Sequence, residues 1–335
     1  MVYSFLIGTK RERGYTIKHS NLLLYFSLFL YVILFLAYSP VSDLFRWRYE
    51  SFFQEIYYIE EYKDTGWILY NKFIRAITNS SIFFFIISAA IYMGGYYCFA
   101  HKYINKTYGL IFILVTTGSF GFVTYGVSTI RAGIALSIFL MALVCKDKRF
   151  LFLILCFLAI IIHKSLLIPV VFFLFSKYIK NINTATIIWL LMLALSILNI
   201  PFVGSVMSEY LSVVDTRSTY FNTVESENYN VGFRWDFLFY SVLPIFYGRY
   251  FIVAKKLHDI FYQRLYITYI LTNAVWLLVI RIAYTDRIAY LSWFLIPFLF
   301  LYPLCILDNL KRKNVKIGIV SFLIVFFNYI IILVS

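Results

Sequence analysis

Two arginines and an aspartate lie in one short polar stretch, residues 281–290, which joins two strongly apolar segments. Charged groups at the edge of a hydrocarbon layer are costly unless they face a polar cavity or a partner, so such residues are candidates for a functional site. The guanidinium groups of Arg281 and Arg287 suit a bidentate anion such as a phosphate or a pyrophosphate, because each presents a fork of N–H donors. The alternative is a hydrophilic turn in which Asp286 pairs with Arg287 and holds two helices in register.

Three further positions carry residue types that suit the same chemistry. His163 has an imidazole that titrates near neutral pH, so it can act as a general base or bind an anion when protonated; a histidine bonded to a backbone carbonyl at a helix end is the alternative. Arg131 stands among small residues, which allow close helix contacts and leave space for a substrate group, although a packing motif with an interfacial arginine fits equally. Arg234 and Asp236 begin an apolar segment, where a helix N-terminus favours anions, or they pair with each other.

The elements that must position these residues are membrane-spanning helices. Of the 335 residues, 62% are hydrophobic and 21% aromatic, and the mean hydropathy is +0.81, outside ordinary soluble usage. The apolar residues fall into blocks of about 15 to 22, the length that a helix needs to cross ~30 Å of hydrocarbon. We expect an all-α polytopic membrane protein with residues 1–335 in a single integral membrane domain. The eleven predicted spans are residues 21–38, 80–100, 108–125, 130–145, 150–162, 165–176, 184–203, 235–254, 265–280, 288–307 and 315–334.

Lys and Arg in the connections between these spans predict the orientation, because such residues concentrate in cytoplasmic loops. All the basic clusters fall on one side, at residues 10–18, 102–106, 146–149, 177–180, 255–264 and 311–316. We therefore expect the N-terminus inside and the C-terminus outside. The formal charge of +14 is then a cytoplasmic rim that meets anionic lipid, so no nucleic-acid partner is expected.

Two long loops, about residues 39–79 and 204–234, fall on the outer side with mixed or net acidic charge. The first has aromatic and charged residues at helical spacing, which predicts amphipathic helices along the outer interface, or simply anchoring by Trp and Tyr. Neither loop contains cysteine, so no disulfide framework is expected there. The chain has no HExxH, paired CxxC or P-loop motif, so we expect no cofactor, no metal and no nucleotide-driven chemistry.

Several stretches together resemble one family. They are STIRAGIALSIFLMAL at 128–143, AIIIHKSLLIPVVFF at 159–173, NVGFRWDFLFYSVLPI at 230–245 and RIAYTDRIAYLSWFLIPFLFLYP at 281–303. The segment KDTGWIL, with Asp64, is similar to an acidic-x-Gly-aromatic segment of that family. The chain thus resembles the EpsG-like polysaccharide polymerases, particularly the Wzy-type O-antigen polymerases of enteric bacteria, from about residue 45 to residue 303. It departs from them upstream, where many relatives have Arg followed by Gly-x-Asp and this chain has Arg46-Trp47-Arg48.

The resemblance implies a metal-independent glycosyltransferase of GT-C-like architecture in the bacterial inner membrane, with its active site facing the periplasm. Such an enzyme of lipopolysaccharide biosynthesis transfers a growing glycan from undecaprenyl pyrophosphate to the terminal sugar of a new lipid-linked repeat unit, with inversion at the anomeric carbon. Its partners would be the undecaprenyl-pyrophosphate-linked oligosaccharides that serve as donor and acceptor, membrane lipid, and a chain-length regulator.

The same resemblance suggests roles for individual residues. The expected pyrophosphate ligands are Arg131, Arg234, Arg281 and Arg287. The candidates for the general base are His163, which we favour, Asp236 and Asp286. The residues expected to bind substrate are Asp64, Tyr290 and Trp293.

Three other classes share some of these features. An O-antigen ligase uses the same donor with a different acceptor, and is the nearest alternative. A transporter of lipid-linked sugars would show internal repeats and charges on both sides of the membrane, whereas this sequence has no clear repeat and no ionisable residues deep on the inner side. A membrane O-acyltransferase would collect its acyl donor from the cytoplasm, where His19, His101 and His258 all stand in basic loops.

Overall fold

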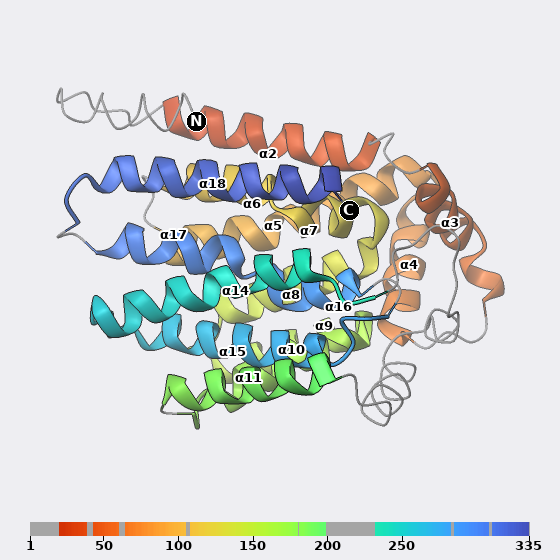
Figure 1. The fold of residues 1–335 in the computed structure, drawn as a ribbon. Coiled ribbons are helices and arrows are strands. Elements are labelled where there is room, and N and C mark those ends of the chain that lie inside the picture. The colour runs from red at the N-terminus through yellow and green to blue at the C-terminus, as the bar shows by residue number, and fades with distance from the viewer. Residues whose placement is uncertain are drawn as a thin grey trace. The chain divides into compact units, whose positions relative to one another are not determined.

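The computed structural model describes residues 20–38, 43–59, 64–104, 108–179, 181–198, 232–282, 285–307 and 310–334. Within these ranges the regular elements are all helices, so the predicted all-α class is confirmed for the described part of the chain. The chain divides into two compact units, and Figure 1 shows the helices of each. Unit 1 is Met1–His163 with Leu304–Ser335, and unit 2 is Lys164–Pro303. The single membrane domain over residues 1–335 stays a prediction.

Unit 1 is built around α8 (Ile130–Val144), which packs against α5 (Ser81–Tyr103) on one side and α9 (Arg149–Ile162) on another. Further helices pack around these three. They are α2 (Ser20–Tyr38), α3 (Asp43–Gln54), η2 (Ile56–Tyr58), α4 (Thr65–Ile77), α6 (Gly109–Thr117), α7 (Phe120–Val123), η3 (Thr124–Ser128) and α18 (Lys313–Val334). The α2 helix packs on α5, α4 on α9, and α18 on α6 and α7.

Small residues let α5 and α8 approach each other closely. A methyl group at Gly95 would lie 2.1 Å from the Ser137 Oγ and 2.7 Å from the Ser137 Cα. The Ser137 hydroxyl donates a hydrogen bond to the Ile91 carbonyl at 2.5 Å. Contact through small residues and a polar cross-link is typical of helix pairs in lipid, where no hydrophobic force drives the helices together.

Unit 2 is built around α15 (Ile260–Leu277), most of whose side chains are buried. The other helices of this unit are η4 (Lys164–Leu166), α10 (Leu167–Phe175), α11 (Ile182–Leu198), α14 (Trp235–Arg249), η5 (Tyr250–Ala254) and α16 (Asp286–Trp293). The last helix, α17 (Ile296–Ile306), begins in unit 2 and ends in unit 1. Pro303 of α17 cannot donate a backbone N–H to the carbonyl four residues earlier, and the Tyr262 hydroxyl donates to that Leu299 carbonyl instead, at 2.8 Å.

All eleven predicted spans overlap helices of the structure. In the described residues, three helices are long and apolar enough to cross a membrane alone: Ser81–Tyr103, Trp235–Ala254 and Asp286–Ile306. The span predicted over 108–125 is bent by 81° between Gly109–Thr117 and Gly121–Ser128, so a fourth crossing would be a broken one. Shorter apolar helices are Phe26–Tyr38, Ile130–Val144, Arg149–Ile162, Lys164–Phe175 and Ile182–Leu198. The protein is therefore membrane-embedded, whereas the count of eleven crossings stays a prediction.

The first predicted outer loop contains the expected amphipathic helices, α3 and α4 (Figure 1). The α4 helix buries Trp67 and Ile74 among other residues, whereas Leu69, Phe73 and Ile77 on another face are 63%, 65% and 64% exposed. In a membrane-embedded protein, such an apolar stripe suits a helix that lies at the membrane interface. Residues 204–231 of the second predicted loop lie outside the described residues.

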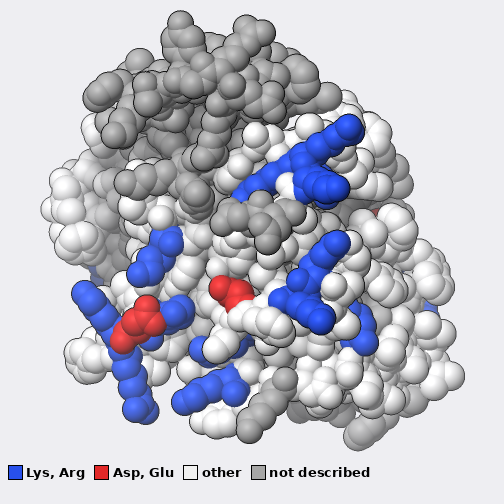
Figure 2. Space-filling model, turned by 90° about the vertical axis from the view of Figure 1, so that its left-hand side faces the viewer, with Lys and Arg blue, Asp and Glu red and all other residues white. Residues whose placement is uncertain are grey.

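Within each unit, basic residues gather at one end of the helices. In unit 1 they stand at the end of α5, between α8 and α9, and at the start of α18; in unit 2 they follow α10 and η5. Figure 2 shows a face on which Lys and Arg predominate over Asp and Glu. This distribution agrees with the basic clusters in the sequence, and the orientation inferred from it stays a prediction.

The contact between α5 and α8 can be tested with adjacent glycines. We expect Gly95→Ala to lower the free energy of unfolding by about 1–3 kcal/mol, because the added methyl group overpacks the backbone of Ser137. Gly94→Ala is the matched control, since its methyl group would meet only the end of Met141 at 3.7 Å. Denaturant unfolding in detergent measures both variants, and equal stability of the two would contradict the close contact.

Candidate functional site

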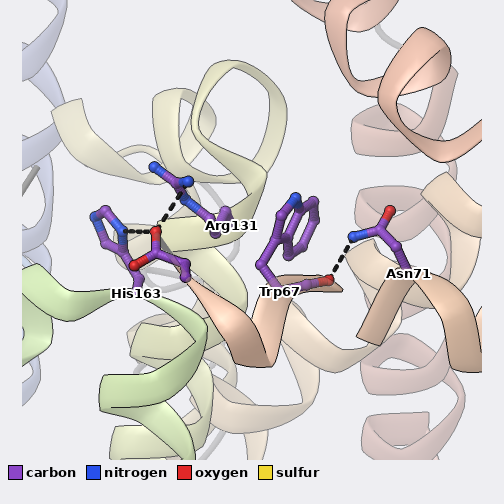
Figure 3. A network of polar contacts seen from close by, with 5 residues as sticks. Trp67, Asn71, Arg131 and His163 are labelled. Carbon is purple, nitrogen blue, oxygen red and sulfur yellow. Dashed lines mark hydrogen bonds and ion pairs between the residues drawn. The ribbon is translucent and has the colours of Figure 1, made fainter. Parts of the chain in front are cut away.

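Three of the residues singled out in the sequence meet in unit 1. The Asp64 Oδ2 lies 2.9 Å from the Arg131 Nη1 and 3.7 Å from the His163 Nδ1. In Figure 3 the dashed lines from Arg131 and His163 converge on this oxygen. All three side chains are buried, with 2%, 5% and 10% of the surface of Asp64, Arg131 and His163 exposed. We call these three residues the Asp64 cluster.

Asp64 is the residue that precedes the first turn of α4. Its carbonyl accepts the Trp67 N–H at 3.0 Å, whereas its carboxylate makes no capping hydrogen bond to the helix. The start of α4 lies against the end of α9, because Gly66 has no side chain there. A methyl group at Gly66 would lie 2.8 Å from the backbone carbon of Ile161. This close approach brings the Asp64 carboxylate to the end of α9.

Arg131 lies in the first turn of α8, a place that electrostatics disfavours for a cation. The exposed N–H groups of a helix N-terminus carry partial positive charge, so a buried arginine there needs an anionic partner. Asp64 is such a partner. The chain enters α8 through η3, a π-helical turn, and such turns often mark functional sites. Gly133 permits this entry, since a methyl group there would lie 2.3 Å from the Tyr125 carbonyl oxygen.

His163 ends α9. Its backbone N–H donates to the Ala159 carbonyl at 3.0 Å, and its own backbone is extended, with φ −149° and ψ 107°. The break between the spans predicted over residues 150–162 and 165–176 is therefore confirmed, because α9 ends at Ile162. Because the chain leaves the helix at this residue, the imidazole is held at a helix end and faces the Asp64 carboxylate.

Trp67 and Asn71 follow Asp64 along α4, and sequence reasoning gave neither a role. The Asn71 amide nitrogen donates to the Trp67 carbonyl at 2.8 Å, as Figure 3 shows. The Trp67 ring, 1% exposed, stacks on Phe52 and Tyr70 at centroid distances of 6.2 and 5.4 Å. The acidic-x-Gly-aromatic pattern was the available signal for this ring packing, because Trp67 is its aromatic residue.

Unit 2 contains the other predicted arginines. Arg234 and Asp236 form a bidentate ion pair, with Nε to Oδ1 at 2.9 Å and Nη2 to Oδ2 at 2.6 Å, as one of the two sequence alternatives predicted. The Arg234 guanidinium also lies 3.7 Å from the centre of the Phe237 ring. Asp236 stands in the first turn of α14, where a negative charge is favoured.

Arg281 lies beside the same segment. Its carbonyl accepts the Gly232 N–H at 3.3 Å, and its guanidinium lies 5.0 Å from the centre of the Phe233 ring. The guanidinium also donates two long hydrogen bonds, of 3.4 Å each, to the Ser196 carbonyl. Asp286 and Arg287 are half-buried in the first turn of α16. Arg234 and Arg281 are thus held on adjacent segments of unit 2, and Arg131 belongs to unit 1.

Tyr290 and Trp293 lie in the core of unit 2, each 2% exposed. The Trp293 indole N–H donates to the Ser241 hydroxyl at 2.7 Å, and its ring packs edge-on against Phe237 and Tyr240. Both residues therefore have a packing role in the described structure. Their predicted role in substrate binding stays a prediction.

The Asp64 cluster combines two chemical capacities. A guanidinium at a helix N-terminus suits a phosphate or pyrophosphate, and a buried imidazole beside a carboxylate suits proton transfer from a hydroxyl. In the described residues, no group of three or more His, Cys, Asp or Glu side chains is arranged to hold a metal ion.

Comparison with known proteins identifies the family. The EpsG family model matches residues 20–335, so the chain belongs to the EpsG family, a membership that supports a polysaccharide-polymerase-like role in general. The resemblance inferred from the sequence is confirmed. No curated protein and no solved structure matches the chain.

The buried ion pair between Asp64 and Arg131 should contribute to the stability of the fold. Asp64→Asn is expected to lower the free energy of unfolding by about 3–5 kcal/mol, because it leaves the Arg131 charge buried without its carboxylate. The double variant with Arg131→Gln should lose less than the sum of the two single variants.

Denaturant unfolding in detergent measures these differences. Asp147→Asn is the control, since it removes an exposed carboxylate that pairs with Lys146 between α8 and α9, and no measurable change is expected. A loss for Asp64→Asn no greater than that of the control would refute the buried pair.

Proposed function

We propose that this protein is a polysaccharide polymerase that transfers a growing glycan from undecaprenyl pyrophosphate to the terminal sugar hydroxyl of a new lipid-linked repeat unit. The observation that carries the proposal is the meeting of Arg131 and His163 at one buried carboxylate in a member of the EpsG family. An arginine and a histidine at one place supply the two groups that this transfer needs, an anion ligand for the leaving group and a proton acceptor for the attacking hydroxyl.

The proposed step is a direct displacement. The acceptor hydroxyl oxygen attacks the anomeric carbon of the donor sugar from the face opposite the pyrophosphate, and the bond between that carbon and the pyrophosphate oxygen breaks. The hydroxyl proton passes to His163, and undecaprenyl pyrophosphate leaves as an anion that Arg131 stabilises. Attack from the opposite face inverts the anomeric centre. The reaction needs no cofactor and no metal ion in this scheme, because guanidinium groups bind the pyrophosphate.

In unit 2, Arg234, Arg281 and Arg287 are proposed as pyrophosphate ligands, as the sequence suggests. Arg234 and Arg281 are supported by their adjacency through Gly232 and Phe233, and Arg287 by its place in the first turn of α16. Asp236 and Asp286 remain the other candidates for the proton acceptor. His163 is favoured over Asp236 because Asp236 is already held in a bidentate pair.

The proposed setting is the bacterial inner membrane, with eleven crossings, a GT-C-like architecture, a cytoplasmic N-terminus and a periplasmic C-terminus. The support is the position of the basic residues in each unit, at the helix ends away from the candidate site residues. The site would then face the periplasm, where flipped lipid-linked repeat units are available. A chain-length regulator is proposed as a partner protein.

The proposed reaction can be tested by the lipopolysaccharide or capsule ladder on a gel from cells that lack the gene. The intact protein should restore the ladder. Arg131→Lys and Arg287→Lys should each reduce polymer by roughly 10²-fold, because a point charge cannot replace the fork of N–H donors on a developing pyrophosphate anion. Arg149→Lys is the matched control, since Arg149 is exposed at the opposite end of α9, and it should restore the full ladder.

The gel pattern of cells that lack the gene distinguishes the possible functions. A single repeat unit on the lipid core is expected for a missing polymerase. A core without any repeat would identify a ligase instead, and an unchanged ladder would refute both glycosyl-transfer functions.

Cysteine labelling tests the orientation. In a variant without the native cysteines, Asn222→Cys should react with a membrane-impermeant thiol reagent in intact spheroplasts, whereas Lys313→Cys should react only after permeabilisation. The reason is that residue 222 falls in a predicted outer loop and Lys313 in a basic cluster at the start of α18. The reverse pattern would overturn the orientation.

A further inference from the structure

One carboxylate oxygen serves both partners in the Asp64 cluster. The Asp64 Oδ2 is the atom that contacts the Arg131 Nη1 at 2.9 Å and the atom that faces the His163 Nδ1 at 3.7 Å. The side chain of Asp64 is 2% exposed. A carboxylate at this depth acts on the chemistry through its neighbours.

We infer that Asp64 is a positioning residue: it holds His163 with Nδ1 turned toward the carboxylate, which leaves Nε2 as the atom that takes the proton from the acceptor hydroxyl. This inference rests on the proposed function. It gives Asp64 a role different from the substrate contact that the sequence suggested.

The position of the carboxylate has two effects on the imidazole of His163: it selects one tautomer, and it stabilises the protonated form. The distance of 3.7 Å from the carboxylate to Nδ1 is too long for a hydrogen bond, but two opposite charges at this separation still interact strongly in a buried place. The carboxylate therefore favours the tautomer with its proton on Nδ1, and it stabilises the imidazolium that forms when Nε2 accepts a proton. A general base with such a partner stays correctly oriented throughout the step.

Arg131 opposes this effect. The Arg131 guanidinium is paired with the same oxygen, so its positive charge reduces the negative potential that Asp64 presents to the imidazole. The other charged residues on the helices packed against α9 are Lys72 and Arg75 of α4, and both lie in the second half of that helix. Arg75 turns to the Asn79 carbonyl at 3.0 Å. Lys164, the next residue along the chain, begins η4 and is partly exposed. Asp64 and Arg131 therefore shift the proton affinity of His163 in opposite directions.

The close contact of α4 with α9 fixes the positions of the Asp64 carboxylate and the His163 imidazole. Asp64 stands one residue before α4, and Gly66 lies against the backbone of Ile161, two residues before His163. The carboxylate and the imidazole are therefore held by backbone contacts and do not depend on a flexible side chain. By contrast, the Asp236 side chain in unit 2 is 31% exposed and is bound to Arg234 through both oxygens.

The test is the pH dependence of polymerisation by the purified full-length protein in proteoliposomes. The probe is the lipid-linked repeat unit extracted from cells that lack the gene. The acidic limb of the kcat/KM profile reports protonation of the base in the free enzyme. In Asp64→Asn, the midpoint of this limb should move to lower pH by roughly one unit or more, because the imidazolium loses its carboxylate. The value of kcat should fall by roughly 10²-fold.

Two more variants test the same midpoint: one should shift it in the opposite direction, and one should keep it near the wild-type value. Arg131→Gln should move the midpoint to higher pH, since Asp64 then acts on His163 alone, and this variant decides the question if Asp64→Asn fails to fold. Asp64→Glu keeps the negative charge, so its midpoint should stay near that of the wild type. Asp147→Asn, at the other ends of α8 and α9, is the control and should leave the profile unchanged.

The outcomes separate the inference from the proposed function. A wild-type protein that makes no polymer from the extracted lipid at any pH would refute the function and the inference together. Polymer formation by the wild type with an unmoved midpoint in Asp64→Asn, or in Arg131→Gln where Asp64→Asn does not fold, would overturn the positioning role and leave the function standing. Opposite shifts in these two variants would support it.

Discussion

The contact between the start of α4 and the end of α9 is the constraint on which the candidate site depends. Gly66 allows the two backbones to approach closely, and this places the Asp64 carboxylate beside His163. A carboxylate buried to 2% exposure would be expensive alone, because it loses its hydration. Arg131 compensates for that loss, and Asp64 in turn compensates for an arginine at a helix N-terminus. Each residue therefore makes the position of the other tolerable.

The helices were predictable because apolar length and charged breaks are local properties of the sequence. Every expected span overlaps a helix, and the break at His163 was expected because polar residues interrupt an apolar run there. The bend at Gly118 and Ser119 was missed, although residues 116–121 (TTGSFG) include the small and polar residues typical of a turn. The prediction placed them inside one span because apolar residues flank them on both sides.

The contacts in the site were only partly predictable. The pair of Arg234 and Asp236 was foreseen as one alternative because the two residues are close in sequence. The pair of Arg131 and Asp64 was not, because residue types and spacing carry no information on which distant helix ends meet. Residue type was also a poor guide to the role of Trp293. An aromatic residue in a polar motif suggested a sugar contact, whereas the structure buries Trp293 against Ser241.

The balance in the Asp64 cluster also bears on which ligand the site would favour. Arg131 already has a carboxylate at 2.9 Å, so a weak or neutral ligand gains little by displacing that contact. A pyrophosphate carries more charge than a carboxylate and can accept several N–H donors at once, from the guanidinium and from the N-terminus of α8. On the proposed function, the internal carboxylate thus makes the site selective for the highly charged end of the donor. The sugars must then be recognised by contacts outside this cluster.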